Sequence, residues 1–138
     1  MNVTEVHSHL ISHNIKPSVQ RVAIMQYLME HKTHPTIDQI FNHLLPHIPT
    51  LSKTTVYNTL KLFYDKRAVL ALTIDEKNVR YDAEVTAHAH FKCKKCGSIQ
   101  DICLEETDIP PFKGSNKLIL EDTQVYFMGI CEKCTSNN

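Results

Sequence analysis

Four cysteines stand in two matched pairs whose spacing suits a metal ion. Cys93 and Cys96 form one C-x-x-C pair, Cys131 and Cys134 form the other, and 34 residues separate the pairs. Two thiolates at this spacing can reach one ion, and a second pair completes a tetrahedral shell of sulfurs about 2.3 Å from zinc. Four thiolates leave no open position, so the pattern predicts a structural Zn²⁺ site. One pair could instead be a redox dithiol or a disulfide. Cys103 has no partner at metal-binding spacing and is expected to be a buried apolar filler.

A second group of residues offers imidazoles and carboxylates. His88 and His90 stand two apart, so on a strand both rings face the same side. Asp82 lies six residues before His88, Asp101 lies on the strand expected after the first cysteine pair, and His34 precedes a predicted helix. Mixed nitrogen and carboxylate ligands suit iron(II) or manganese(II), which are less thiophilic than zinc. From spacing alone, the histidines could also be solvated or helix-capping residues.

A third feature is a polar helix face. Ser52 is a good N-cap for a helix running to about Lys66. Its expected buried face is Val56, Leu60, Phe63 and Tyr64, and the opposite face presents Thr54, Tyr57, Asn58 and Lys61. On the recognition helix of a helix-turn-helix, such hydroxyl and amide groups enter the major groove and bond base edges or phosphates. The alternative is an ordinary solvated face.

The elements around these residues follow the order of a winged helix-turn-helix. Apolar periodicity predicts three further helices and two short extended runs. Thr36 and Gln39 form a T-x-x-Q capping box at the start of the third helix. The predicted segments are helices over 3–11, 18–31, 36–45 and 52–66, then extended runs over 69–74 and 79–81 joined by a polar turn.

The character of the chain changes after Ala83, where the cysteine pairs and further strand-like segments over 98–104 and 124–128 appear. The sequence therefore predicts an α+β protein with two domains. Residues 1–83 are expected to form a winged helix-turn-helix domain that binds DNA. Residues 84–138 are expected to form a small α/β domain for dimerisation and metal sensing, with the structural zinc site.

Composition excludes some classes of protein, but it does not predict DNA binding, which rests on the sequence pattern. The 138 residues carry no formal net charge, so bulk charge gives no reason to expect a nucleic-acid partner. No run of 18 apolar residues exists, so no membrane partner is expected. Five cysteines and no visible secretion signal argue against a disulfide framework. A cytoplasmic location is expected.

Several strings in this chain resemble the ferric-uptake-regulator family, in the family's order and over nearly the whole chain. They are His34-Pro-Thr36, Thr54-Thr-Val-Tyr-Asn-Thr-Leu60, Arg80-Tyr-Asp82, His88 through Gly97, and Cys131-Glu-Lys-Cys134. The resemblance implies a homodimeric repressor whose winged-helix domains bind an inverted-repeat operator in double-stranded DNA. It also implies that the C-terminal domains dimerise and that a regulatory metal between the domains locks the DNA-binding shape.

Within that family the chain is most similar to the peroxide-stress branch. That branch's regulatory iron(II) or manganese(II) site falls here on His34, Asp82, His88, His90 and Asp101. The iron-uptake branch usually has glutamate where Asp101 stands, and the zinc-uptake branch tends to place a cysteine near Asp82. One segment departs from the family, because residues 108–116 contain two prolines and a glycine and cannot form the usual three-turn helix.

The resemblance implies a regulator, not an enzyme. We expect hydrogen peroxide to inactivate it through iron-catalysed oxidation of a ligand histidine, and the manganese form to ignore peroxide. Lys16 matches a family position that reaches into an A·T-rich minor groove, and Lys77 in the polar turn is expected to reach a phosphate. An iron- or manganese-responsive uptake regulator is the alternative. A non-haem iron oxygenase is a distant one, since two histidines and a carboxylate can form its facial triad.

Overall fold

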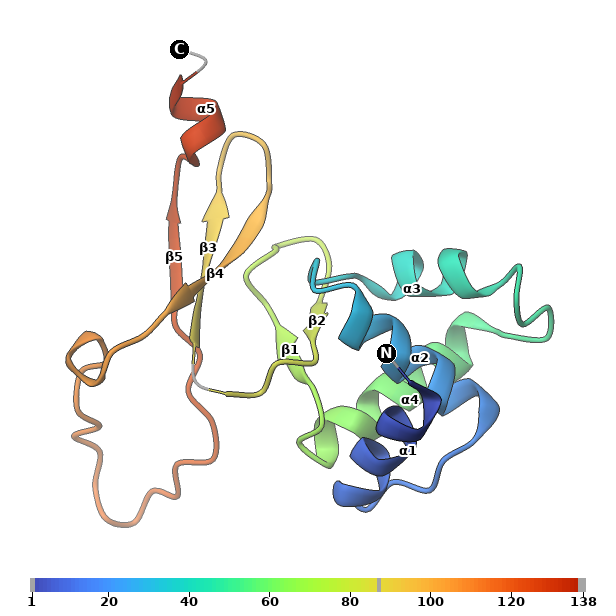
Figure 1. Cartoon of the computed structure of the whole chain (residues 1–138). Helices are drawn as coiled ribbons and strands as arrows, with labels where there is room; N and C mark the ends of the chain where they lie inside the picture. Colours follow the sequence, from blue (N-terminus) through green and yellow to red (C-terminus); the bar gives the residue numbers. More distant parts are fainter. Residues whose placement is uncertain (1, 87, 137–138) are drawn as a thin grey trace. The chain divides into compact units, whose positions relative to one another are not determined.

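The computed structural model describes residues 2–86 and 88–136. The chain divides into two compact units, Met1–Val85 and Thr86–Asn138 (Figure 1). This division falls two residues beyond the boundary that the sequence predicts after Ala83.

The N-terminal unit contains four helices followed by a short antiparallel hairpin. They are α1 (Val3–Ser12), α2 (Val19–Glu30), α3 (Ile37–Leu44), α4 (Lys53–Asp65), β1 (Leu70–Leu72) and β2 (Arg80–Asp82). The side chains of Asn2, Ser18, Thr36 and Ser52 cap the four helices by accepting backbone N–H bonds in the first turns. The capping box of Thr36 and Gln39 and the N-cap at Ser52 are therefore confirmed.

One apolar core holds this unit together. Each helix contributes a buried stripe, and the stripes of α2, α3 and α4 pack on one another. On α4 the buried residues are Val56, Thr59, Leu60 and Phe63. The prediction that Tyr64 is buried is wrong, because its side chain is 44% exposed. Tyr64 follows Phe63 at the margin of the stripe, and Thr59 occupies the other margin.

The C-terminal unit is a three-stranded sheet with a short terminal helix. The strands are β3 (His88–Cys93), β4 (Ile99–Cys103) and β5 (Tyr126–Gly129), in the order β4-β3-β5. β3 pairs antiparallel with β4 and parallel with β5. A 3₁₀ turn (η1, Glu106–Asp108) follows β4, and α5 (Glu132–Ser136) follows β5 (Figure 1).

Little apolar surface is buried in this second unit. Among its described residues the buried apolar side chains are those of Ala89, Cys93 and Cys131. The expectation that Cys103 is buried is wrong, since it lies exposed at the end of the edge strand β4. Between residues 109 and 125 the chain is irregular, as the prolines predict. No helix in the described part of the chain is long and apolar enough to cross a membrane.

Candidate metal centres and nucleic-acid interface

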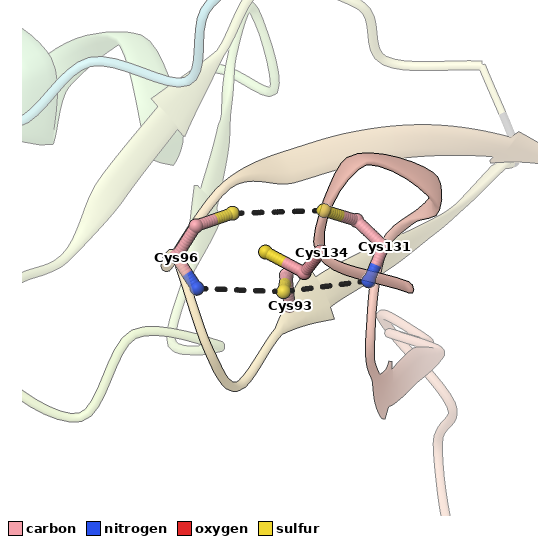
Figure 2. A group of neighbouring side chains, drawn as sticks. All are labelled: Cys93, Cys96, Cys131 and Cys134. Carbon is pink, nitrogen blue, oxygen red and sulfur yellow. Dashed lines mark hydrogen bonds between the residues drawn. The ribbon is translucent and has the colours of Figure 1, made fainter. Parts of the chain in front are cut away.

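The four paired cysteines converge on one point in the C-terminal unit (Figure 2). Their sulfur atoms all lie within 4.8 Å of one another. The Sγ atoms of Cys96 and Cys131 are 3.7 Å apart. Two sulfurs on one tetrahedral zinc ion, each at about 2.3 Å, are separated by about 3.8 Å. The cluster therefore has the donors and the spacing that fit a structural Zn²⁺ ion.

Parallel pairing of β3 with β5 explains how distant pairs meet. Cys93 ends β3 and stands opposite Gly129, the last residue of β5, so Cys131 follows at the same end of the sheet. Gly97 has a φ of +77° and donates its N–H to the Cys93 carbonyl, which closes the tight turn that carries Cys96. A residue with a side chain would be strained at that φ, so glycine allows the chain to reverse direction after Cys96.

Hydrogen bonding prepares these thiols for a cation. The backbone N–H groups of Cys96 and Cys131 each lie 3.4 Å from Cys93 Sγ, and they lower the pKa of Cys93 to about 6. Contact with Ser98 lowers the pKa of Cys96. The bond with Cys131 and burial raise the pKa of Cys134 to about 12. The thiols therefore do not all ionise easily together, because negative charge on one sulfur raises the pKa of its neighbours. A bound dication would stabilise the thiolates.

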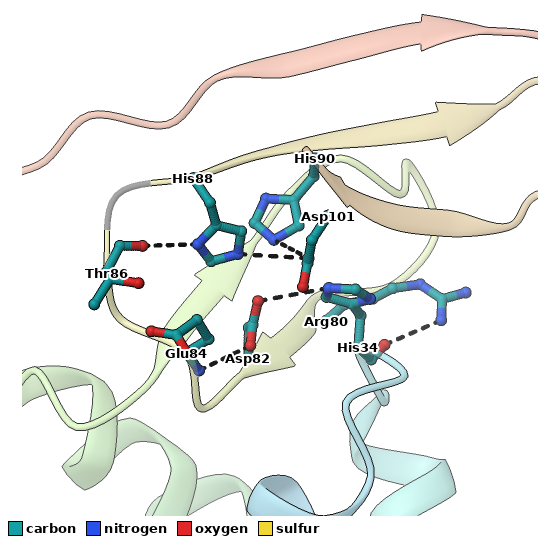
Figure 3. Close-up of polar contacts among 8 residues, drawn as sticks. All are labelled: His34, Arg80, Asp82, Glu84, Thr86, His88, His90 and Asp101. Carbon is teal, nitrogen blue, oxygen red and sulfur yellow. Dashed lines mark hydrogen bonds and ion pairs between the residues drawn. The ribbon is translucent and has the colours of Figure 1, made fainter. Parts of the chain in front are cut away.

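His34 and Asp82 come together within the N-terminal unit. His34 Nε2 lies 3.5 Å from Asp82 Oδ2, and both side chains are buried (Figure 3). His34 has a φ of +55°, which is costly for a residue other than glycine. Two bonds hold it there: Arg80 Nη1 donates to the His34 carbonyl at 3.1 Å, and Tyr81 N donates to the Pro35 carbonyl at 3.0 Å.

Arg80 holds the His34 loop in place, a role that the sequence alone does not predict. Its guanidinium bonds the His34 carbonyl (Figure 3) and also contacts the Asp75 carboxylate at 3.0 and 3.1 Å. It therefore joins the hairpin turn to the His34 loop. One feature of the sequence could have indicated this role. Arg80 stands two residues before Asp82 in a strand, so both side chains lie on one face.

His88, His90 and Asp101 form a second group within the C-terminal unit. His90 and Asp101 are directly paired across β3 and β4, and His88 lies on the same face as His90. Asp101 Oδ1 lies 3.5 Å from His88 Nε2 and 3.4 Å from His90 Nε2 (Figure 3). His88 Nδ1 lies 2.7 Å from the Thr86 carbonyl, so that nitrogen is the donor and Nε2 offers its lone pair.

The predicted polar face of α4 is exposed. Thr54, Tyr57, Asn58 and Lys61 all lie at the surface. A hollow of about 580 Å³ adjoins this face, between α4 and the start of α2. Its lining includes the predicted Lys16 and Asn58 and adds Arg21, which bonds the Lys16 carbonyl at 2.8 Å. Lys77 is exposed in the turn between β1 and β2.

Arg21 was absent from the predicted set, although it stands in the first turn of α2 beside the proline break. Two cations and a helix N-terminus around one hollow form a surface that suits a phosphate group.

The chain is similar to known proteins in sequence and in structure. A model of the ferric uptake regulator family matches residues 12–127. The chain belongs to the ferric uptake regulator family. The peroxide-responsive repressor PerR of Staphylococcus epidermidis is 33% identical over 122 residues, which are 87% of this chain and 81% of the relative. PerR of Staphylococcus aureus is 40% identical over 87 residues, covering 63% of this chain and only 59% of the relative.

Solved structures of the family share the fold. The Helicobacter pylori ferric uptake regulator Fur superposes with a TM-score of 0.73 at 17% identity, over 98% of this chain and 95% of that one. PerR from Streptococcus pyogenes superposes with a TM-score of 0.53 at 29% identity, over 96% and 92%. The family membership and the α+β fold class predicted from the sequence are confirmed.

Proposed function

We propose that this chain is a metal-dependent transcriptional repressor that senses peroxide. The observation that carries the proposal is the division of the ligands. A His–Asp pair lies in the unit with the polar helix face, and a His–His–Asp trio lies in the other unit. One ion bound by both groups would fix the two units relative to each other.

The donor set supports iron(II) or manganese(II) as that ion. His34 and Asp82 supply two ligands, and His88, His90 and Asp101 supply three. Neither group alone satisfies ions that accept five or six ligands, whereas three imidazoles and two carboxylates together suit both metals. If Asp82 and Asp101 were brought to one site, their carboxylates would repel each other unless a dication lay between them, so a shared ion would favour that arrangement.

We propose that the protein is a homodimer and that its two N-terminal units bind DNA. Two recognition helices must meet successive major-groove faces of an inverted repeat, so metal that fixes their separation raises operator affinity. The C-terminal unit offers the surface for a second copy. Its exposed large apolar side chains include Leu118, Ile119, Leu120, Phe127 and Met128, and β5 is an edge strand.

Peroxide is proposed to act at the ligand histidines. Iron(II), if held by these residues, would supply the redox chemistry that activates peroxide. Overall, one ligand imidazole would gain one oxygen atom, and the other peroxide oxygen would leave as water. His88 and His90 have ring centroids 4.4 Å apart and face one carboxylate, so both are exposed to such an oxidant. An oxidised imidazole is a poor ligand, and its loss would release the two units. The names of the two staphylococcal relatives support this branch of the family.

The test compares the iron and manganese forms of the zinc-loaded protein. We expect both to shift A·T-rich inverted-repeat DNA, and equal peroxide to abolish the shift of the iron form alone. Mass spectrometry should then find one added oxygen on the peptide bearing His34 or on that bearing His88 and His90. Equal insensitivity of both forms would favour a metal-uptake regulator. Loss of binding with unmodified histidines and oxidised cysteines would refute the scheme.

A further inference from the structure

Three histidines and a tyrosine gather in the N-terminal unit, apart from the residues discussed above. His31 caps the C-terminal end of α2, His43 lies in the last turn of α3, and His47 follows four residues later. The ring centroids of His31 and His43 are 5.2 Å apart, and those of His43 and His47 are 6.3 Å apart. The Tyr27 ring stacks on His31 at 4.4 Å and lies 4.6 Å from His43.

The ring spacing of His31 and His43 is close to that of two imidazoles on a common ion. A ligating nitrogen lies about 2.1 Å from zinc and the ring centroid about 1 Å further, so two tetrahedral ligands have centroids about 5 Å apart. The His31–His43 pair already has this separation. The ligand nitrogens of the three histidines do not all lie within 4.8 Å of one another, so His47 must change rotamer to join the other two. Its side chain is exposed, and exposed side chains change rotamer on a nanosecond timescale.

His31 is held in the tautomer that a metal ligand needs. Its Nδ1 lies 3.1 Å from the Tyr27 carbonyl, which can only accept a hydrogen bond. Nδ1 therefore carries the proton, and Nε2 presents its lone pair. Metal-bound histidines commonly donate their second nitrogen to a backbone carbonyl in this way, which fixes the ring. Stacking on Tyr27 adds a second constraint on the same ring.

We propose that His31, His43 and His47 form a binding site for a late first-row divalent cation such as Zn²⁺ or Ni²⁺. Imidazole donors suit these ions, whereas manganese(II) prefers carboxylate and carbonyl oxygens. Such an ion would join the C-terminal end of α2 to that of α3. It would also clamp one end of the segment leading from His31 to His34. The proposal does not depend on the regulatory site, and it would stand if that site failed.

The experiment titrates Ni²⁺ into the full-length, zinc-loaded protein and follows residue-resolved NMR signals. Paramagnetic Ni²⁺ should broaden the signals of Tyr27, His31 and His43 along a single saturable curve. Broadening of His88 and His90 would report the regulatory residues separately. We expect His43→Gln to weaken the Tyr27 response by about tenfold or more, which corresponds to at least about 1.4 kcal/mol.

A matched variant separates a site from general histidine binding. His7 is an exposed histidine on α1 outside the cluster, so His7→Gln should leave the Tyr27 response unchanged. His47→Gln provides a second test that leaves the Tyr27 stack intact, and it should weaken binding in the same direction. A Tyr27 response that survives both His43→Gln and His47→Gln would overturn the proposal and leave the cluster as aromatic packing between α2 and α3.

Discussion

At the scale of the residue, the His34 loop shows how one side chain can set the geometry of another. Its positive φ persists because Arg80 and Tyr81 bond the carbonyls of His34 and Pro35. Arg80 presents several donors in a rigid fork, so it can hold Asp75 and this carbonyl at once. The orientation of the proposed ligand therefore depends on a residue that would not touch the ion.

Replacing Arg80 tests that dependence. Arg80→Ala should weaken Mn²⁺ binding by about 10- to 100-fold, the usual effect of losing a group that orients a ligand. Arg80→Lys keeps the charge but not the fork, so it should recover only part of the affinity. Calorimetric titration of the zinc-loaded protein measures this. Lys66→Ala, at the exposed C-cap of α4, is the control. Unchanged Mn²⁺ affinity in Arg80→Ala would exclude a positioning role.

His9 on α1 predicts a pH dependence of stability. Burial and the neighbouring His13 lower its pKa below 6.5, although a bond with Ala68 opposes the shift. The unfolded chain then binds the proton more tightly, so stability is full above about pH 6.5 and falls as the pH drops toward the lowered pKa. Urea unfolding midpoints at pH 7.5 and 5.5 should differ less in His9→Gln than in the wild type. His7→Gln should match the wild type, and equal pH dependence in all three would contradict the assignment.

At the scale of the element, the four-cysteine cluster lies in a unit with a small core. Few of the described side chains of this unit are buried, so an ion joining the β3 and β5 ends would supply much of its folding free energy. Structural zinc contributes on the order of 10 kcal/mol. Cys96→Ser or Cys131→Ser should therefore unfold this unit and abolish dimers. Circular dichroism and sedimentation measure both effects, with the exposed Cys103→Ser as control. A stable dimer without zinc would exclude the structural role.

The polar face of α4 gives the DNA prediction. Tyr57→Ala should weaken specific binding more than non-specific binding, because base contacts carry discrimination and phosphate contacts do not. Lys16→Ala should lower affinity and reduce the salt slope by about one unit. Lys117→Ala removes an exposed cation from the other unit and serves as control. Fluorescence anisotropy over a salt series distinguishes these effects. Wild-type behaviour of both variants would exclude this face as the groove-binding surface.

Local features of the fold could be predicted from the sequence, whereas features that depend on distant parts of the chain could not. Caps at Ser52 and Thr36 are local signals, and the structure confirms them. The convergence of the cysteine pairs was predictable from spacing, although the parallel β3–β5 pairing behind it was not. Tyr64, Cys103 and Arg80 were misjudged or missed because their surroundings depend on partners distant in the chain. Periodicity reports which face a residue occupies, but not whether another element covers it.

At the scale of the whole molecule, the proposed switch requires that two ligand groups share one ion. The His34–Asp82 pair belongs to one unit and the His88–His90–Asp101 trio to the other. If each group bound its own ion, metal would not couple the units, and DNA affinity would not respond to it. The number of Mn²⁺ ions bound per chain, and the effect of a substitution in each ligand group, therefore distinguish a switch from two unrelated sites.

Zinc-loaded protein should bind one Mn²⁺ per chain. Either His34→Gln or His90→Gln should lower the affinity for that ion by about tenfold or more. Mn²⁺ should also reduce the spread of interdomain distances, measured by X-ray scattering, in the wild type and in His7→Gln but in neither ligand variant. The reason is that a shared ion gains affinity only by holding both units, so loss of one end removes the coupling as well as the binding. Two independent Mn²⁺ ions, or a His34→Gln variant with wild-type affinity, would mean that the two groups act separately.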